Sequence, residues 1–260
     1  MTIGFIGTGN MGGALMAAMA PTYSLCAYNR GKEKLLRVCK ATGAAPMNSV
    51  SEVARNADIL ILAVKPYIIP EVLEQLVGQL RPGTLVVSVA VSLPLSLYEK
   101  ALGSDTKIIR AMPNTPAAVG AGVTSFCCNA ACTETDRDAF VGAFSTAGIT
   151  EELPEKLMGA ASALTGSSPA YICMLIEAMA DAAVCQGIPR AQAIRMAAQA
   201  VQGTAKLVLE SGKHPEQLKD EVCSPGGTTI RGVAALEQTG FRGSIIAALN
   251  ACGEAAKDKE

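Results

Sequence analysis

The feature that most constrains the fold is the glycine-rich segment from Gly7 to Gly12, with the sequence GTGNMG. It follows the short apolar run Thr2 to Ile6 and leads into an apolar helical pattern from Met11 to Met19. Glycines at this spacing permit a tight turn and let the backbone approach a pyrophosphate at the positive end of the helix. The spacing alone is weak evidence. The strand before it, the helix after it and a second strand at the expected distance favour a dinucleotide site over a merely structural turn.

The chain from Thr2 to about Leu153 alternates short apolar runs with helical patterns, and most runs end in Gly, Pro, Asn or Ser. This alternation is typical of a parallel sheet with helices on both faces. The predicted strands are Thr2 to Ile6, Ser24 to Tyr28, Ile59 to Val64, Leu85 to Val89, Lys107 to Met112, Gly122 to Cys128 and Ile149 to Glu152.

After Pro154, β-branched clusters become rare and Ala, Met, Gln and Leu recur at helical spacing. The predicted helices are Met158 to Leu164, Pro169 to Cys185, Arg190 to Glu210 and Thr228 to Leu236. We therefore predict an α/β fold with two domains. Residues 1–153 form a Rossmann-like dinucleotide-binding domain, and residues 154–260 form an all-helical dimerisation and substrate-binding domain.

Composition indicates an oligomer. The 260 residues carry a net charge of −1, and 17% are charged, against roughly 25% in ordinary globular chains. The near-neutral charge argues against a nucleic-acid partner. The stretch Tyr171 to Val184 is apolar almost all round its helix, which predicts a symmetric, interleaved dimer. The longest apolar stretch, Tyr171 to Cys185, contains Glu177 and Asp181 and is shorter than the roughly 20 residues of a membrane span, so we expect no membrane partner.

The cysteine and histidine content limits the chemistry. Nine scattered cysteines without a CxxC pair predict reduced thiols and a cytoplasmic protein. No Lys or Arg precedes Arg30, which argues against a secretory signal. With His214 as the single histidine, we expect neither a metal site nor a His-dependent triad, and His214 is predicted to begin a surface helix.

The end of the second predicted strand indicates which dinucleotide binds. NAD-specific sites place an acid there, on the ribose 2′-hydroxyl, but this chain has Asn29 and Arg30, followed by Lys32 and Lys34. A cation and an amide favour the 2′-phosphate of NADP. The alternative is that Arg30 is an ordinary solvated loop charge.

Two further segments follow predicted strands at the edge where open α/β sheets bind ligands. In the first, Ala63 to Pro66, Lys65 either braces the cofactor or is a solvated loop lysine. The second, Arg110 to Pro116, forms either a rigid rim of the nicotinamide pocket or a structural turn.

A fourth motif, Ser224 to Thr229, lies in the helical half and has the sequence SPGGTT. Its backbone N–H groups, at the start of a helix, suit a small carboxylate without an arginine. The alternative is an ordinary threonine N-cap after a Gly-Gly turn.

Together these blocks resemble the pyrroline-5-carboxylate reductase family over essentially the whole chain. The blocks are GFIGTGNMGGA at 4–14, LAVKP at 62–66, IIRAMPNTP at 108–116, SSPAY at 167–171 and VCSPGGTTI at 222–230. The resemblance implies reduction of L-1-pyrroline-5-carboxylate to L-proline with NADPH, or in some members NADH, in the last step of proline biosynthesis. It also implies a helical dimerisation domain, with homodimers that often assemble into larger rings such as decamers.

The resemblance also implies roles for individual residues. The cofactor contacts would be Ile6, Gly7, Thr8, Gly9, Asn10, Met11, Asn29, Arg30, Asn48, Ala63, Val64, Lys65, Pro66 and Ala90. Thr229 would be the catalytic residue, through a hydrogen bond to the ring nitrogen. The substrate contacts would be Glu155, Ser224, Gly226, Gly227, Thr228 and Thr229.

The sequence disfavours three other functions. Hydroxyacid and 6-phosphogluconate-type dehydrogenases use a lysine early in the long interdomain helix, but no Lys or Arg occurs between Lys156 and Arg190. A non-catalytic NADP sensor would be expected to lose loop residues such as Thr229. A redox sensor built on Cys127, Cys128 and Cys132 is disfavoured because strand cysteines usually act as small buried apolar groups. The sequence leaves open the choice between NADPH and NADH, proline inhibition and activity on a six-membered imine.

Overall fold

The computed structural model describes residues 1–257, and the chain divides into two compact units. The first unit contains residues 1–166 and the C-terminal segment from Gly253, and the second contains Ser167–Cys252. The predicted domain boundary, between residues 153 and 154, lies earlier in the chain than the division after Gly166. The two predicted domains, with their functions, remain a prediction.

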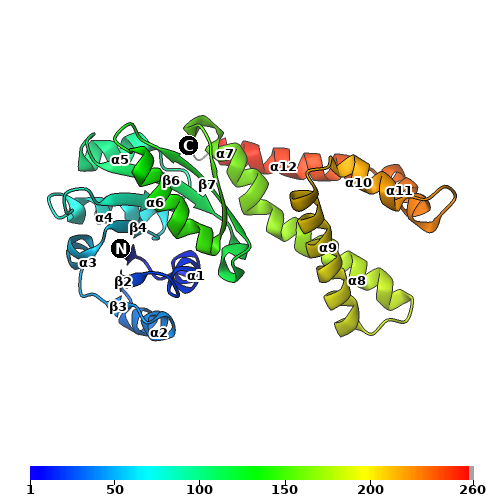
Figure 1. Cartoon of the computed structure of the whole chain (residues 1–260), viewed down its shortest axis with the longest axis horizontal. Coiled ribbons are helices and arrows are strands. Elements are labelled where there is room, and N and C mark those ends of the chain that lie inside the picture. Colours follow the sequence, from blue (N-terminus) through cyan, green and yellow to red (C-terminus); the bar gives the residue numbers. More distant parts are fainter. Residues whose placement is uncertain (258–260) are drawn as a thin grey trace. The chain divides into compact units, whose positions relative to one another are not determined.

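An eight-stranded sheet forms the centre of the first unit, in the order β3-β2-β1-β4-β5-β6-β7-β8 (Figure 1). The strands are β1 Thr2–Ile6, β2 Ser24–Tyr28, β3 Ala45–Pro46, β4 Ile59–Leu62, β5 Leu85–Ser88, β6 Lys107–Pro113, β7 Gly122–Cys128 and β8 Gly148–Glu152. The order reverses between β1 and β4, which places a topological switch point at their carboxyl ends. All seven predicted strands are present, with ends within two residues of the predicted ones.

Helices cover both faces of this sheet because successive strand residues point to opposite sides. One core joins the strands to α1 Asn10–Met19, α2 Lys32–Thr42 and α6 Glu134–Phe144, with Phe5, Phe140 and Phe144 fully buried. The other core joins them to α3 Val50–Asn56, α4 Ile69–Leu76 and α5 Leu95–Leu102. The remaining helical turns of this unit are η1 Pro66–Ile68, η2 Thr115–Val119, η3 Ser145–Ala147, η4 Glu155–Leu157 and α7 Met158–Ala161.

Two details of the sheet differ from the prediction. Strand β7 runs antiparallel to β6, so the sheet is not parallel throughout. The connection from Asn114 to Ala121 is shorter than the dozen or so residues that a parallel crossover needs, so the chain turns directly back. Strand β3 was not predicted, since its two residues, one of them a proline, carry too little pattern.

The second unit consists of helices, as predicted. They are α8 Ser168–Cys185, α9 Arg190–Ser211, α10 Pro215–Val222, α11 Thr228–Gln238 and α12 Phe241–Lys257, whose last residues, from Gly253, belong to the first unit. Helices α8 and α9 pack against each other (Figure 1). A π-helical turn, Ser162–Ser167, leads into α8. The prediction omitted α12 and gave only the start of α10, at His214. His214 begins α10 as expected, and its Nδ1 accepts a hydrogen bond from Glu216 N at 3.2 Å.

Little of this helical unit is buried within the chain. Its buried apolar side chains are Ala180, Ala193, Ala197 and Leu218. Large apolar side chains such as Met174, Met196 and Leu209 are 67%, 61% and 74% exposed. Such exposure is unusual for a water-soluble surface and indicates a surface that another molecule covers.

Candidate active site

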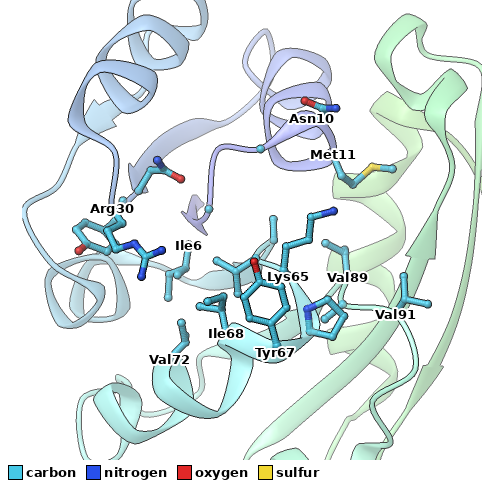
Figure 2. A pocket seen from close by; sticks show the side chains of 18 of the residues that line it. Ile6, Asn10, Met11, Arg30, Lys65, Tyr67, Ile68, Val72, Val89 and Val91 are labelled. Atoms are coloured by element: carbon cyan, nitrogen blue, oxygen red, sulfur yellow. The ribbon is translucent and has the colours of Figure 1, made fainter. Parts of the chain in front are cut away.

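A cleft of about 890 Å³ opens at the carboxyl ends of the strands, where the order of the sheet reverses. Its wall includes residues that follow β1, β2, β4 and β5, and the end of β6. Figure 2 shows Arg30 at one side of the cleft, Val89 and Val91 at the other, and Lys65 and Tyr67 between them. The cleft lies where doubly wound α/β folds bind dinucleotides.

The glycine-rich turn between β1 and α1 forms one wall. Gly7 has a φ of +101°, and a Cβ there would lie 2.5 Å from the Ala63 carbonyl oxygen. A Cβ on Gly12 would overlap the Gly7 carbonyl oxygen, whereas a Cβ on Gly9 would meet nothing within 4 Å. Gly7 and Gly12 therefore allow close packing, and Gly9 leaves open space in the cleft wall.

The beginning of α1 suits an anion. Its N-cap, Gly9, has no side chain to accept hydrogen bonds from the first turn, and no acidic residue lies in that turn. Thr8 N donates to Asn29 Oδ1 at 3.2 Å, and Asn29 Nδ2 donates to Gly31 O at 3.1 Å. Asn29 thus joins the ends of β1 and β2 and stabilises the turn. The buried Thr8 hydroxyl has no hydrogen-bond partner among residues 1–257.

Three cations line the cleft: Arg30, Lys34 and Lys65. Within the described part of the chain none of them has an ion-pair partner, and Glu71 is the one acid in the wall. Cations around an uncapped helix N-terminus attract phosphate groups. The end of β2 has Asn29 and Arg30 in place of a carboxylate, so nothing there would repel a 2′-phosphate. The residues present therefore fit NADP.

The cleft wall contains twelve of the fourteen predicted cofactor residues, all except Thr8 and Asn48. Thr8 is buried behind the turn. Asn48 is exposed, and both its backbone N and its Nδ2 donate to Glu52 Oε2, at 2.6 and 3.2 Å. Their predicted cofactor contacts remain predictions.

Sequence reasoning missed the wall formed by η1, by α4 and by the start of α3. This wall contains Val50, Tyr67, Ile68, Glu71, Val72 and Gln75. A signal was available, because the helical pattern after Pro66 places positions 68, 72 and 75 on one face.

The segment Arg110 to Pro116 contains the end of β6 and the residues after it, and its side chains divide between the cleft and the protein interior. Met112, Pro113 and Thr115 line the cleft. Asn114 is buried and has a structural role: its Nδ2 donates to Thr165 O at 3.0 Å, and its Oδ1 accepts from Val123 N at 2.9 Å.

The second unit contains the loop from Ser224 to Thr229. Gly226 has a φ of +70°, and Gly227 N donates to Ser224 O at 3.0 Å, which closes a tight turn. The N-cap of α11 is Gly227 and not a threonine, so the alternative of a threonine N-cap is wrong. Thr228 and Thr229 lie in the exposed first turn of α11, whose N–H groups have no side-chain cap.

Comparison with known proteins identifies the family. A family model described as pyrroline-5-carboxylate reductase dimerisation matches residues 155–259, and one described as NADP oxidoreductase, coenzyme F420-dependent, matches residues 2–92. The pyrroline-5-carboxylate reductase of Escherichia coli K12 is 47% identical over 257 residues, covering 97% of this chain and 96% of that protein. This chain belongs to the pyrroline-5-carboxylate reductase family.

Solved pyrroline-5-carboxylate reductases agree over the full length. The structure from Coxiella burnetii has a TM-score of 0.92 at 34% identity and covers 99% of this chain and 98% of that one. The NADP-bound structure from Plasmodium falciparum has a TM-score of 0.87 at 34% identity, with coverage of 100% and 98%. The predicted fold, a dinucleotide-binding domain followed by a helical dimerisation domain, is confirmed.

The dimerisation match also explains the most apolar helix. The helical stretch Glu155–Cys185 spans 31 residues and contains an 18-residue segment with a mean hydropathy of 1.3, which by length and composition would suffice to cross a membrane; only 6% of that segment is buried. This stretch begins where the reductase dimerisation region begins, so a second copy of the chain covers apolar surface that one copy leaves exposed. The match implies a homodimer.

Glu155 has two protein partners. Its Oε1 accepts from Leu95 N at 2.7 Å and lies 3.3 Å from Arg110 Nη1. The substrate contact predicted for Glu155 from the family resemblance remains a prediction.

Proposed function

We propose that this chain is an NADP-dependent oxidoreductase that reduces L-1-pyrroline-5-carboxylate to L-proline in proline biosynthesis. The observation that carries this assignment is the 47% identity to a pyrroline-5-carboxylate reductase over nearly the whole of both chains. The cleft supports it independently, because its cations and uncapped helix suit a phosphorylated dinucleotide.

The first unit binds the cofactor. Bound NADPH supplies the hydride. The N-terminus of α1 and the open space at Gly9 receive the pyrophosphate, while Arg30 and Lys34 hold the 2′-phosphate. Lys65 lies between the two ends of the cleft and braces the phosphates or the ribose. Val89, Met112 and Pro113 form an apolar wall that excludes water from the nicotinamide end.

The loop Ser224–Thr229 binds the substrate. Backbone N–H groups at the start of α11 donate hydrogen bonds to the carboxylate, which needs no cationic side chain there. The Thr229 hydroxyl hydrogen-bonds the ring nitrogen and orients the imine. Hydride adds to C5 and the nitrogen gains one proton, so a substrate that arrives as the iminium requires no histidine acid. Catalysis then depends on positioning and on fixed dipoles.

The homodimer is the basic assembly, and the dimers associate into a decamer in the cytoplasm. The dimerisation match and the exposed apolar helices support the dimer. The nine free cysteines favour a reducing compartment.

The first experiment measures NADPH oxidation with pyrroline-5-carboxylate, alongside NADH and the six-membered cyclic imine, and compares kcat/KM. We expect turnover with the five-membered ring and a preference for NADPH. Cofactor binding without turnover of either imine would refute the reductase assignment and favour a non-catalytic NADP-binding protein.

A further inference from the structure

We propose that Glu155 is a positioning residue of the cofactor cleft. Its carboxylate fixes two segments: the loop Val89–Pro94 and the end of strand β6 that follows Arg110. This inference rests on the proposed function of the cleft. It gives Glu155 a role different from the substrate contact predicted from the family resemblance.

The first contact anchors the end of the loop. Leu95 is the first residue of α5, and its N–H is one of the donors that a helix leaves unpaired. Pro94, the N-cap, provides no side-chain acceptor, and Glu155 Oε1 accepts this hydrogen bond at 2.7 Å from sixty positions along the chain. The beginning of α5 is therefore held by a residue of η4.

The loop before Leu95 forms part of the cleft and carries strain. Val89, Ala90 and Val91 line the cleft. Ser92 follows them with a φ of +64°, the one positive φ at a non-glycine among residues 1–257. A backbone in this region persists only where its surroundings fix it, and such strain clusters at functional sites.

The other end of this loop is also fixed. The buried Ser88 Oγ lies 2.6 Å from Tyr98 Oη and accepts from Ala90 N at 3.3 Å. Two attachments therefore flank the strained residue: the Ser88–Tyr98 pair on one side and Glu155 on the other. Loss of the Glu155 attachment would allow Ser92 to relax and move Val89–Val91.

The second contact reaches the neighbouring wall. Arg110 lies on β6 with a side chain only 4% exposed, two residues before Met112, which lines the cleft. A buried guanidinium needs a compensating charge, and Glu155 Oε1 provides one at 3.3 Å. Burial and the Glu155 carboxylate raise the pKa of the adjacent Cys127 to about 11, while Arg110 opposes the rise. Glu155 thus acts on both walls of the nicotinamide end without itself lining the cleft.

The test compares Glu155→Ala, Glu155→Gln and the double variant Arg110→Met with Glu155→Met, by NADPH affinity, kcat, the KM for each substrate and urea stability. We expect Glu155→Ala to weaken NADPH binding about tenfold and to leave the KM for the imine unchanged, because a preorganised wall is lost. Glu155→Gln retains an oxygen that accepts a hydrogen bond from Leu95 N, so this variant should lose less NADPH affinity than Glu155→Ala.

The double variant separates positioning from stability. The double variant removes the buried guanidinium together with its Glu155 contact, so it should be more stable than Glu155→Ala, but the Leu95 anchor is still missing and NADPH binding should stay weak. Asp136→Ala is the matched control, since Asp136 pairs with Lys107 on the same strand β6 at 2.8 Å and does not line the cleft. It should destabilise the protein without changing NADPH affinity.

Three results would overturn the inference: unchanged NADPH affinity in Glu155→Ala, recovered affinity in the double variant, or a rise confined to the KM for the imine. The last result would assign Glu155 to the substrate. Absence of imine reduction by the unaltered enzyme would refute the proposed function instead, and the NADPH affinities would still test Glu155.

Discussion

The two units of this chain are similarly apolar in sequence but differ in how they bury that surface. The first unit packs its apolar side chains into two continuous cores on either side of a sheet. The second buries little more than three alanines and one leucine, and leaves methionines and leucines exposed on α8 and α9. The difference shows that one unit can complete its core within a single copy, whereas the other requires a second copy.

The largest expected effect is on the dimer. Met174→Asp places a carboxylate on the exposed apolar surface of α8. If a second copy covers that surface, the charge loses its water without gaining a partner, and dimerisation should weaken by about 4 kcal/mol, or roughly three orders of magnitude in Kd. Analytical ultracentrifugation measures the change.

The matched control lies in the first unit. Leu36 on α2 is 57% exposed, comparable to Met174, and belongs to the unit that completes its own core. Leu36→Asp should leave the dimer intact. Equal weakening by both variants would mean that the contrast between the units does not identify the interface.

Gly12→Ala should produce a large effect within the first unit. Its Cβ would collide with the Gly7 carbonyl oxygen and come within 3.1 Å of Ala63 Cβ, so we expect a loss of about 2 to 3 kcal/mol in unfolding free energy. Gly13→Ala meets nothing within 4 Å and should be stabilising by up to about 1 kcal/mol, as in an ordinary helix. Urea unfolding at fixed protein concentration measures the unfolding free energy of both variants. Similar losses of stability in Gly12→Ala and Gly13→Ala would show that the close contact with the Gly7 carbonyl is not the reason for a glycine at position 12.

Much of the fold could be predicted because strong local patterns met no competing signal. The seven predicted strands are runs of Val, Ile and Leu bounded by turn residues, and their spacing allowed helices between them. Strand β3 was missed, and helix α10 was predicted only at its start, because two residues, or one short polar helix, carry too little periodicity. The direction of β7 was predictable in principle from the short connection after Pro113.

The site was predictable where chemistry depends on the backbone and less so where it depends on packing. Glycine spacing and strand ends located Gly9, Arg30 and Lys65 correctly in the cleft wall. The two contacts of Glu155 could not be predicted, since they join residues far apart in the sequence that no local motif relates. The place of Asn114 behind the cleft, and not on its rim, depends on the same kind of long-range contact.

Thr229→Ala separates the chemical role of the second unit from the cofactor role of the first. Loss of one directed hydrogen bond to the ring nitrogen should lower kcat by one to two orders of magnitude, about 1.4 to 3 kcal/mol, with NADPH affinity unchanged. Thr229→Ser, which retains a hydroxyl, should remain active. Turnover at the unaltered rate in Thr229→Ala would remove its assigned role.

Arg30→Ala should have the converse effect, on cofactor affinity alone. Arg30 is exposed at the end of β2 and lines the cleft, so its loss should weaken NADPH binding by about 1.4 kcal/mol, or tenfold, through one lost phosphate contact. Affinity for NADH, which lacks the 2′-phosphate, should not change. Fluorescence titration with both cofactors is the measurement, and an equal loss for both would make Arg30 a general rim residue.

The smallest expected effect distinguishes how the two units hold their charges. Burial alone would raise the pKa of Asp136, but hydrogen bonds from Lys107 and Thr133 hold it below the ordinary value of 3.8. A lowered pKa stabilises the folded state above pH 3.8, and this contribution disappears as the pH falls through the folded value.

In the second unit, hydrogen bonds from Lys219 and Arg242 lower the pKa of Glu216, at exposed positions. Relative to Asp136→Asn, the unaltered protein should gain about 1 kcal/mol near pH 6 and should lose this advantage as the pH falls through the lowered pKa, with little dependence on salt. The corresponding advantage over Glu216→Gln should vanish in high salt, because water and ions screen an exposed pair. Urea midpoints at fixed protein concentration test both. If salt reduced the stability contributions of Asp136 and Glu216 equally, the two units would not differ in how strongly solvent screens their ion pairs.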